Sequence, residues 1–196
     1  MEGATFVLQK LIEMTTSANT EKINWNLDAS HSEIGFKAKH LMITNVSGTF
    51  GTFDVQTQTI GEDFTTAEIS FTADTATIHT GSEQRDGHLK SADFFDSELY
   101  PQIKFVSTSI EKIDHEKFLL HGNFTIKDVT HPATFHIEFG GIAKDPWGNE
   151  KAGFSITGKI NRTNWNLNWN AALEAGGLLV SEEIKLHAEI QLVKAA

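Results

Sequence analysis

The spacing of apolar residues constrains the fold of this chain more than any other feature of its sequence. From Asn24 onward apolar and polar residues alternate one by one over most segments, as Ile184, Leu186, Ala188 and Ile190 do near the end. A period of two is the pattern of a β-strand with one buried face. The same alternation recurs at residues 34–40, 67–71, 103–105, 118–120, 135–139 and 154–160. The chain is therefore predicted to be all-β, with about eight strands.

Turn-forming residues separate these segments. The expected turns or bulges lie at Gly48, Gly51, Gly61, Gly122, Gly140, Gly141 and the cluster at residues 145–148. Many short strands with turn signals between them predict an antiparallel meander that closes as a barrel or folds as a sandwich.

Residues 80–100 break the pattern, because the period of two is lost there. Ser82 and Ser91 are suitable helix N-caps, and Pro101 ends the segment before the next strand. One or two short helices are predicted in this region.

Composition excludes several classes of function. The chain has 16 Lys and Arg against 26 Asp and Glu, a formal charge of −10, so it offers no general electrostatic attraction to nucleic acid. It contains no cysteine, which excludes disulfides, thiolate nucleophiles and cysteine-ligated metal sites.

Residues 1–21 are interpreted as an extension to a single barrel domain at residues 22–196. The extension is a tag, an upstream mis-start or a short helix, and it lacks the basic start and long apolar run of a signal peptide. No segment reaches the roughly 20 apolar residues of a membrane span. We therefore expect a soluble, cytoplasmic protein without stable membrane insertion.

The aromatic residues leave two interpretations of the interior open. The chain has 14 Phe and 4 Trp but only 1 Tyr. These rings form either a packed core or the wall of an apolar cavity, because an eight-stranded barrel is wide enough for side chains or for one ligand.

The sequence contains no complete motif for catalysis or cofactor binding. No GxGxxG is present, and Phe154 stands where a P-loop would need its lysine. Ser155 lies on a predicted strand, without the sharp turn that exposes a catalytic serine. His131 and His136 are five residues apart on one strand and so face opposite sides. We predict no catalytic residue, no cofactor and no metal site.

The segment RDGHLKSADFFD, residues 85–96, concentrates polar donors beside apolar rings. Arg85, His88 and Lys90 suit an anionic or carbonyl head group, with Phe94 and Phe95 close by. The alternative is purely structural: Arg85 pairs with the neighbouring aspartate, and the two Phe pin a helix over a barrel mouth.

Four segments together resemble a known family. They read INWNLDASHSEIGFKAKHLMITNVSGTFGTFD, HTGSEQRDGHLKSADFFDSELYPQIKFVSTS, GNFTIKDVTHPATFHIEF and KDPWGNEKAGFSITGKINRTNWNLNW. In this order they are similar to the YceI-like family of bacterial polyisoprenoid-binding proteins, over residues 23–193. The resemblance implies an eight-stranded, antiparallel, lipocalin-like barrel with short helices near its mouth. It also implies an isoprenoid or other long-chain lipid in the pore, often a homodimer, and no catalytic residue.

Carried onto this chain, the resemblance suggests which residues meet a ligand. The expected head-group residues are Arg85, His88, Lys90 and Arg162. The expected walls of the tail cavity are Trp25, Phe36, His40, Phe50, Phe53, Ile69, Phe71, Phe94, Phe105, Phe135, Phe154 and Ile156. The chain departs from the family after Arg162, where Thr163 and Asn164 replace the usual acidic and aromatic residues. It also lacks the secretory leader that many members carry, which favours a cytoplasmic role.

Three functional hypotheses follow. The first is non-catalytic binding, storage or transport of a long-chain isoprenoid or another amphiphilic lipid, such as a quinone tail or a fatty amide or acid. The second is a lipid- or small-acid-processing enzyme with His88 as base and Asp86 as its orienting group, although side chains two apart on a helix diverge. The third is a packed-core stress-response module that holds no ligand.

Overall fold

All strands that the structure describes belong to one antiparallel sheet. The structure is a computed structural model that describes residues 21–172 and 178–195, so the predicted N-terminal extension lies outside the described residues except for Glu21. The strands are β1 Lys22–Leu27, β2 Glu33–His40, β3 Thr44–Phe50, β4 Phe53–Ile60, β5 Asp63–Asp74, β6 Ile78–His79, β7 Gln102–Lys112, β8 Lys117–Ile126, β9 Val129–Lys144, β10 Glu150–Asn161 and β11 Val180–Lys194.

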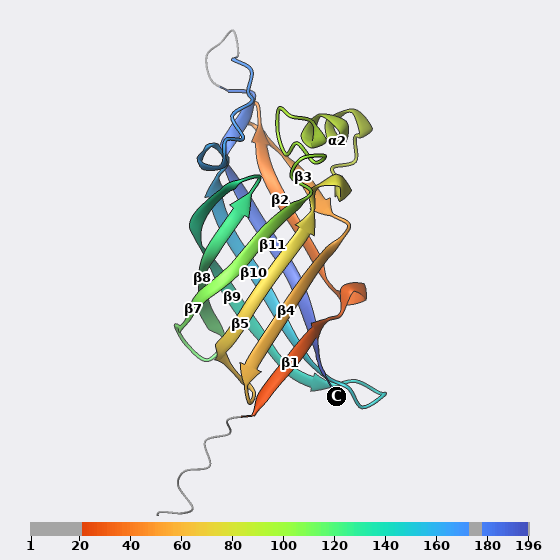
Figure 1. Ribbon diagram of the computed structural model, residues 1–196, viewed down its shortest axis with the longest axis vertical. Helices are drawn as coiled ribbons and strands as arrows, with labels where there is room; N and C mark the ends of the chain where they lie inside the picture. The colour runs from red at the N-terminus through yellow and green to blue at the C-terminus, as the bar shows by residue number, and fades with distance from the viewer. Residues whose placement is uncertain (1–20, 173–177, 196) are drawn as a thin grey trace, which may run out of the picture.

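The sheet closes on itself through β11. This strand pairs along β10 on one side, and on the other side it pairs with β2 at residues 180–189 and with β1 at residues 192–194. The ring therefore runs β1-β4-β5-β7-β8-β9-β10-β11, while β2, β3 and β6 extend the wall at one end. The structure confirms the predicted eight-stranded antiparallel barrel, seen along its side in Figure 1.

Two stretches of the chain that build the barrel wall are each divided into two strands. The 3-10 helix η1, Ala29–His31, separates β1 from β2, and a bend at Gly51 and Thr52 separates β3 from β4. The upper halves, β2 and β3, pair with each other, whereas the lower halves, β1 and β4, pair with each other. The eight-stranded barrel is therefore built from more than eight separate strands.

Two glycines that were expected in turns or bulges lie inside strands, and Gly122 lies opposite the register shift between Ser107 and Ser109 of β7. Gly48 is in β3 and Gly122 is in β8, and the rings of Phe36 and Phe105 cover them. A Cβ atom at either position would clash with the ring, so these glycines make room for aromatic side chains. Gly61 fits the turn prediction, because its φ of 57° suits a residue without a side chain.

A helix lies against one end of the barrel, called the upper end below because it is uppermost in Figure 1. This helix, α2, spans Glu83–Lys90, and Ser82 is its N-cap as predicted. Ser91 is not a second N-cap: it ends α2, and its hydroxyl donates to the His88 carbonyl. Residues 91–100 form turns, because their backbone N–H groups bond back to α2 and to each other. The helices of the described ranges are too short and too polar to serve as a membrane span.

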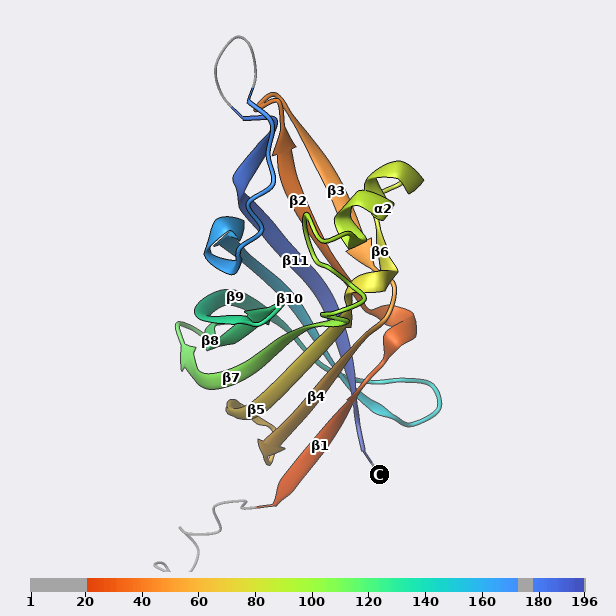
Figure 2. The ribbon, with the colours of Figure 1, turned by 45° about the horizontal axis from the view of Figure 1, so that its top comes forward.

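Two further 3-10 helices were not predicted from the sequence. They are η2, Thr75–Thr77, and η3, Arg162–Trp165. η3 follows β10 and leads into residues 166–172, called the strap here, which crosses to the start of β11. Turned views show the strap segment and α2 at the same end of the molecule (Figure 2).

Candidate functional site

The barrel encloses a cavity of about 790 Å³. This volume lies within the roughly 300–1,000 Å³ range of small-molecule sites in proteins. Its lining is mostly apolar and comes from nearly every strand, because the inward residues of each alternating set face the interior. Ile184, Leu186, Ala188 and Ile190 of β11 all line it, as their spacing predicts.

Aromatic rings close the cavity at its lower end. The Phe64 ring lies 4.9 Å from Phe154 and 5.1 Å from Trp25, between ring centroids. Phe64 and Phe154 line the cavity, whereas Trp25 lies behind them. The indole Nε1–H of Trp25 donates to Thr59 at 2.9 Å, which fixes the ring in the core below.

The structure places most of the expected tail residues in the cavity lining. Those that line it are Phe36, His40, Phe50, Ile69, Phe71, Phe94, Phe105, Phe135, Phe154 and Ile156. Trp25 and Phe53 do not, and this corrects the expectation for both. Phe53 is the first residue of β4 and packs, half-buried, against the lower core that contains Trp25 and Ala73.

Glycine positions shape the middle of the cavity. Phe135 in β9 lies directly across from Gly158 in β10, and a Cβ atom there would clash with the ring. The Phe135 ring also packs edge-on against Phe105, 5.4 Å away, and Phe124, 6.0 Å away. The rings therefore form a tight group along the wall of the cavity.

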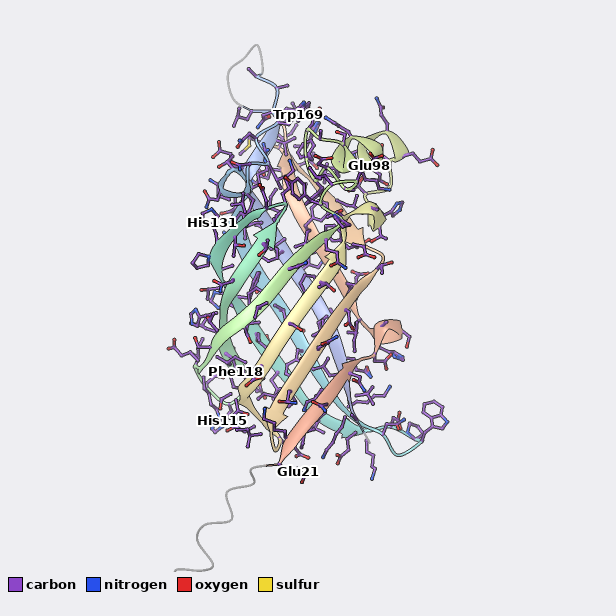
Figure 3. All side chains as sticks on the ribbon, viewed as in Figure 1. Glu21, Glu98, His115, Phe118, His131 and Trp169 are labelled. Carbon is purple, nitrogen blue, oxygen red and sulfur yellow. The ribbon has the colours of Figure 1, made fainter. Side chains whose placement is uncertain are left out.

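The upper end is covered by two segments that are far apart in sequence. Residues 83–95 supply His88, Leu89, Phe94 and Phe95 to the cavity lining, and the strap supplies Trp169. The Trp169 ring lies 4.6 Å from the His88 ring and 5.5 Å from the Phe94 ring. Figure 3 shows Trp169 at the end where α2 lies and His115 at the opposite end.

Polar groups at this upper end are few and mostly held by the protein. Arg85 is exposed, lines the cavity and donates from Nε to the Thr80 hydroxyl at 2.7 Å and from Nη2 to the Thr80 carbonyl at 2.8 Å. Lys90 does not line the cavity, which corrects its expected place among the head-group residues. It is the last residue of α2, where its carbonyl accepts from Ser97 N–H.

Arg162 is a buried cation beside the cavity. Its side chain is 3% exposed, and its guanidinium donates to the carbonyls of Ser181, Leu167 and Val180. Burial lowers its pKa, and the nearby charge of Glu182 opposes this effect. The guanidinium therefore fastens the strap to the start of β11, and it brings a positive charge to the lining.

The His88 and Asp86 side chains do not form a dyad, which corrects the arrangement expected for an enzyme. Asp86 accepts from the Thr80 N–H at 2.8 Å, and its other oxygen lies 3.1 Å from His79 Nδ1. Burial alone would raise the pKa of Asp86, but the hydrogen bonds from Thr80 together with the nearby His79 lower it. His88 Nε2 instead lies 2.9 Å from Asp93. Asp86 anchors α2 to the barrel.

No group of three or more metal-ligating side chains gathers anywhere in residues 21–172 and 178–195. His131 and His136 face opposite sides of β9, as their spacing predicts. His131 Nε2 lies 3.0 Å from the Asn164 carbonyl, whereas His136 stands in the wall across from Thr157 and Leu119.

The sequence model of the YceI-like domain matches residues 25–192. The chain belongs to the YceI-like family. A UPF0312 protein of Staphylococcus aureus strain MSSA476 is 38% identical over 86% of this chain and 96% of its own length. A UPF0312 protein of Staphylococcus epidermidis is 39% identical over 85% of this chain and 95% of its own length.

Solved structures of other YceI-like proteins share the fold. The Campylobacter jejuni YceI protein is 33% identical, with a TM-score of 0.71 over 87% of this chain and 97% of that protein. A polyisoprenoid-binding domain from Saccharophagus degradans has a TM-score of 0.63 over 87% of this chain and 98% of that domain. Because its sequence identity is 11%, the second comparison supports the fold alone.

Sequence reasoning missed several residues of this YceI-like cavity. Leu167 and Trp169 of the strap line it, and with Trp165 they alternate in the sequence as inward residues of a strand do. Thr57 also lines the cavity; it is 5% exposed, and its hydroxyl has no partner among the described residues. That hydroxyl is buried and unpaired, and nothing in the local sequence indicates it.

Proposed function

We propose that this protein binds a long-chain amphiphilic lipid, such as a polyisoprenoid or a fatty acyl compound, in the barrel cavity and stores or transports it without chemical change. The observation that carries the proposal is the apolar cavity of about 790 Å³ inside a closed barrel. Packed protein interiors have few voids larger than a water molecule. A cavity of this size therefore disfavours the module with a fully packed core.

Burial of the chain supplies the affinity. Each CH₂ group moved from water into an apolar site contributes about 0.8 kcal/mol, so a long chain is held without many polar contacts. The ligand class is also the one that the YceI-like sequence pattern implies, and a solved domain of the same fold is described as polyisoprenoid-binding. Because His88 and Asp86 contact different partners, the structure disfavours the lipid- or small-acid-processing enzyme.

The head group is proposed to lie at the upper end, where the polar lining residues gather. Arg85 and His88 come from α2, and Arg162 adds a buried positive charge on the side of β11. A carboxylate, phosphate or carbonyl group fits these donors. The tail then extends toward the floor formed by Phe64 and Phe154.

The test is mass spectrometry of an organic extract of the protein, purified from its own organism without detergent. We expect a prenyl or acyl compound in a one-to-one ratio with the protein, and none from an equal amount of protein denatured before purification. The change Ala188→Phe places a ring in the cavity and should abolish the co-purifying lipid, whereas Lys185→Phe adds the same ring on the exposed face of β11. Lipid retained equally by both variants, or absent from the wild type after incubation with prenyl lipids, contradicts the proposal.

A further inference from the structure

The hairpin between β2 and β3 ends in bulky apolar side chains that face solvent. Leu41, Met42 and Ile43 are 37%, 51% and 83% exposed. Leu178, 37% exposed, lies beside them, since the Leu41 N–H donates to the Leu179 carbonyl at 2.8 Å. We call these four residues the apical tip. In Figure 2 the β2–β3 hairpin ends at the same end of the molecule as α2, beside the start of β11.

The tip adopts a backbone conformation that its residues disfavour. Leu41 and Met42 have φ values of 52° and 61°, and Ile43 N–H donates to the His40 carbonyl at 3.2 Å. Two central residues with positive φ are the mark of a type I′ turn, for which Asn-Gly is strongly preferred. Large side chains in this region of φ destabilise the fold. Because these side chains are exposed, packing does not offset the cost.

The charge around the tip differs from that of the whole chain. Although the formal charge is −10, residues 34–53 contain no Asp or Glu and include Lys37 and Lys39. The strap beside the hairpin, residues 166–172, contains none either. Glu182 and Glu183, which follow on β11, contact Asn161 and Lys159 instead. Glu174, between the strap and Leu178, lies outside the described residues. Within the described residues, no carboxylate of this stretch of the hairpin or of the strap repels a phosphate-bearing surface.

The tip is continuous with the upper rim of the cavity. Lys39 and His40, just before it, line the cavity, and so do Leu179 and Val180 after Leu178. Any partner surface that contacts the apical tip therefore lies next to the upper end of the cavity, where α2 and the strap meet.

We propose that the apical tip docks on the surface of a phospholipid bilayer, with its apolar side chains in the interface and the lysines near the phosphates. This inference rests on the proposed function, because the bilayer is then the source or the destination of the chain lipid. Short apolar elements flanked by lysine bind bilayer interfaces in this way. A second copy of the chain fits less well, since four side chains fall short of the roughly 800 Å² per partner that a stable dimer buries.

The test is flotation of the full chain with phosphatidylcholine vesicles. The double change L41N/M42G installs the residues that the turn prefers, so it should leave the melting temperature unchanged or higher. It should lower vesicle partition by roughly tenfold or more, because two apolar side chains are lost from the interface. Ile43→Ser should act in the same direction. Its matched control is Trp147→Ser, since both side chains are 83% exposed but Trp147 lies in the β9–β10 loop, away from the tip.

Two parallel measurements separate the outcomes. Binding of a fluorescent fatty acid in the absence of vesicles reports on the cavity, and this binding should be unchanged in L41N/M42G. If no variant binds the fatty acid, the proposed function is contradicted. Vesicle partition still tests the tip in that case. The tip proposal is overturned if the wild type does not float, or if Trp147→Ser lowers partition as much as Ile43→Ser. It is also overturned if sedimentation shows that L41N/M42G only converts a dimer to a monomer.

Discussion

Asp28 at the break between β1 and β2 shows how one side chain holds the barrel together. Its carboxylate accepts from Lys151 Nζ of β10 at 2.7 Å and from the Ser30 hydroxyl at 2.6 Å, and His31 Nδ1 lies 3.0 Å away. These interactions, above all the Lys151 hydrogen bond, hold the pKa of Asp28 well below its usual range. The side chain is mostly buried, so solvent screens the interaction little.

The first prediction concerns this carboxylate and pH. Because the pKa of Asp28 is lower in the folded state than in the unfolded chain, its stabilisation is present above about pH 4 and is lost as pH falls further. Asp28→Asn should reduce the free energy of unfolding by about 1.5–3 kcal/mol at pH 7 and by less at pH 2.5. Urea denaturation at both pH values measures this. The exposed Asp54→Asn is the control, and an equal loss at both pH values would contradict the assignment.

At the scale of the element, the upper end of the cavity is closed where side chains of the strap touch side chains of α2 and of the turns after it. No backbone connection joins these two described segments there. Trp169 of the strap meets His88 of α2 and Phe94 of the turns that follow. The hydrogen bonds of Asp86 hold α2 on one side, and those of Arg162 hold the strap on the other. The aromatic contact is therefore the weakest part of this closure.

The second prediction is that Trp169→Ala speeds ligand release. Aromatic pairs contribute about 0.5–1.5 kcal/mol beyond the area they bury, so the dissociation rate should rise about two- to tenfold. The melting temperature should change little, because the ring is only half-buried. Stopped-flow displacement of a fluorescent fatty acid measures the rate. Trp147→Ala removes an exposed indole elsewhere; if it has the same effect, the closure does not depend on Trp169.

At the scale of the whole molecule, the cavity exists because the sheet closes into a barrel. The β1–β11 pairing joins the chain ends of the barrel, and Lys194 on β11 bonds Glu150 at 2.7 Å and Glu62 at 3.1 Å beside it. This ring of eight strands leaves a cavity of about 790 Å³ inside it, so the folded state gains stability from a ligand that fills the space.

The third prediction follows from this linkage. A chain lipid present at 100 times its dissociation constant should stabilise the folded protein by about 2.7 kcal/mol. For a chain of this size that corresponds to a rise in melting temperature of about 5–10 °C. Calorimetry with and without the lipid measures it. Ala188→Phe, which fills part of the cavity, should show a much smaller rise, and an equal rise in both proteins would place the ligand elsewhere.

Much of the fold could be predicted at the level of single elements. The alternation in β11 predicts which of its residues face inward, and Ser82 predicts the start of α2. The break at Gly51 agrees with the turn or bulge expected there. The split at η1 could not be predicted, because it depends on β11 pairing with β2 along one part of its length and with β1 along another. Ser91 was misassigned for a similar reason: the hydroxyl of a serine caps either end of a helix, and only the surrounding turns decide which.

The sequence by itself determined the fold class, the family and the apolar character of the interior, because these depend on the period and type of residues along the chain. Only the tertiary structure decided which rings line the cavity and which lie behind its floor, as with Phe64 and Trp25. It also decided that Asp86 meets His79 and Thr80, and that Trp169 meets His88. Contacts of this kind join residues from separate elements, and alternation along one strand says nothing of the distance between two.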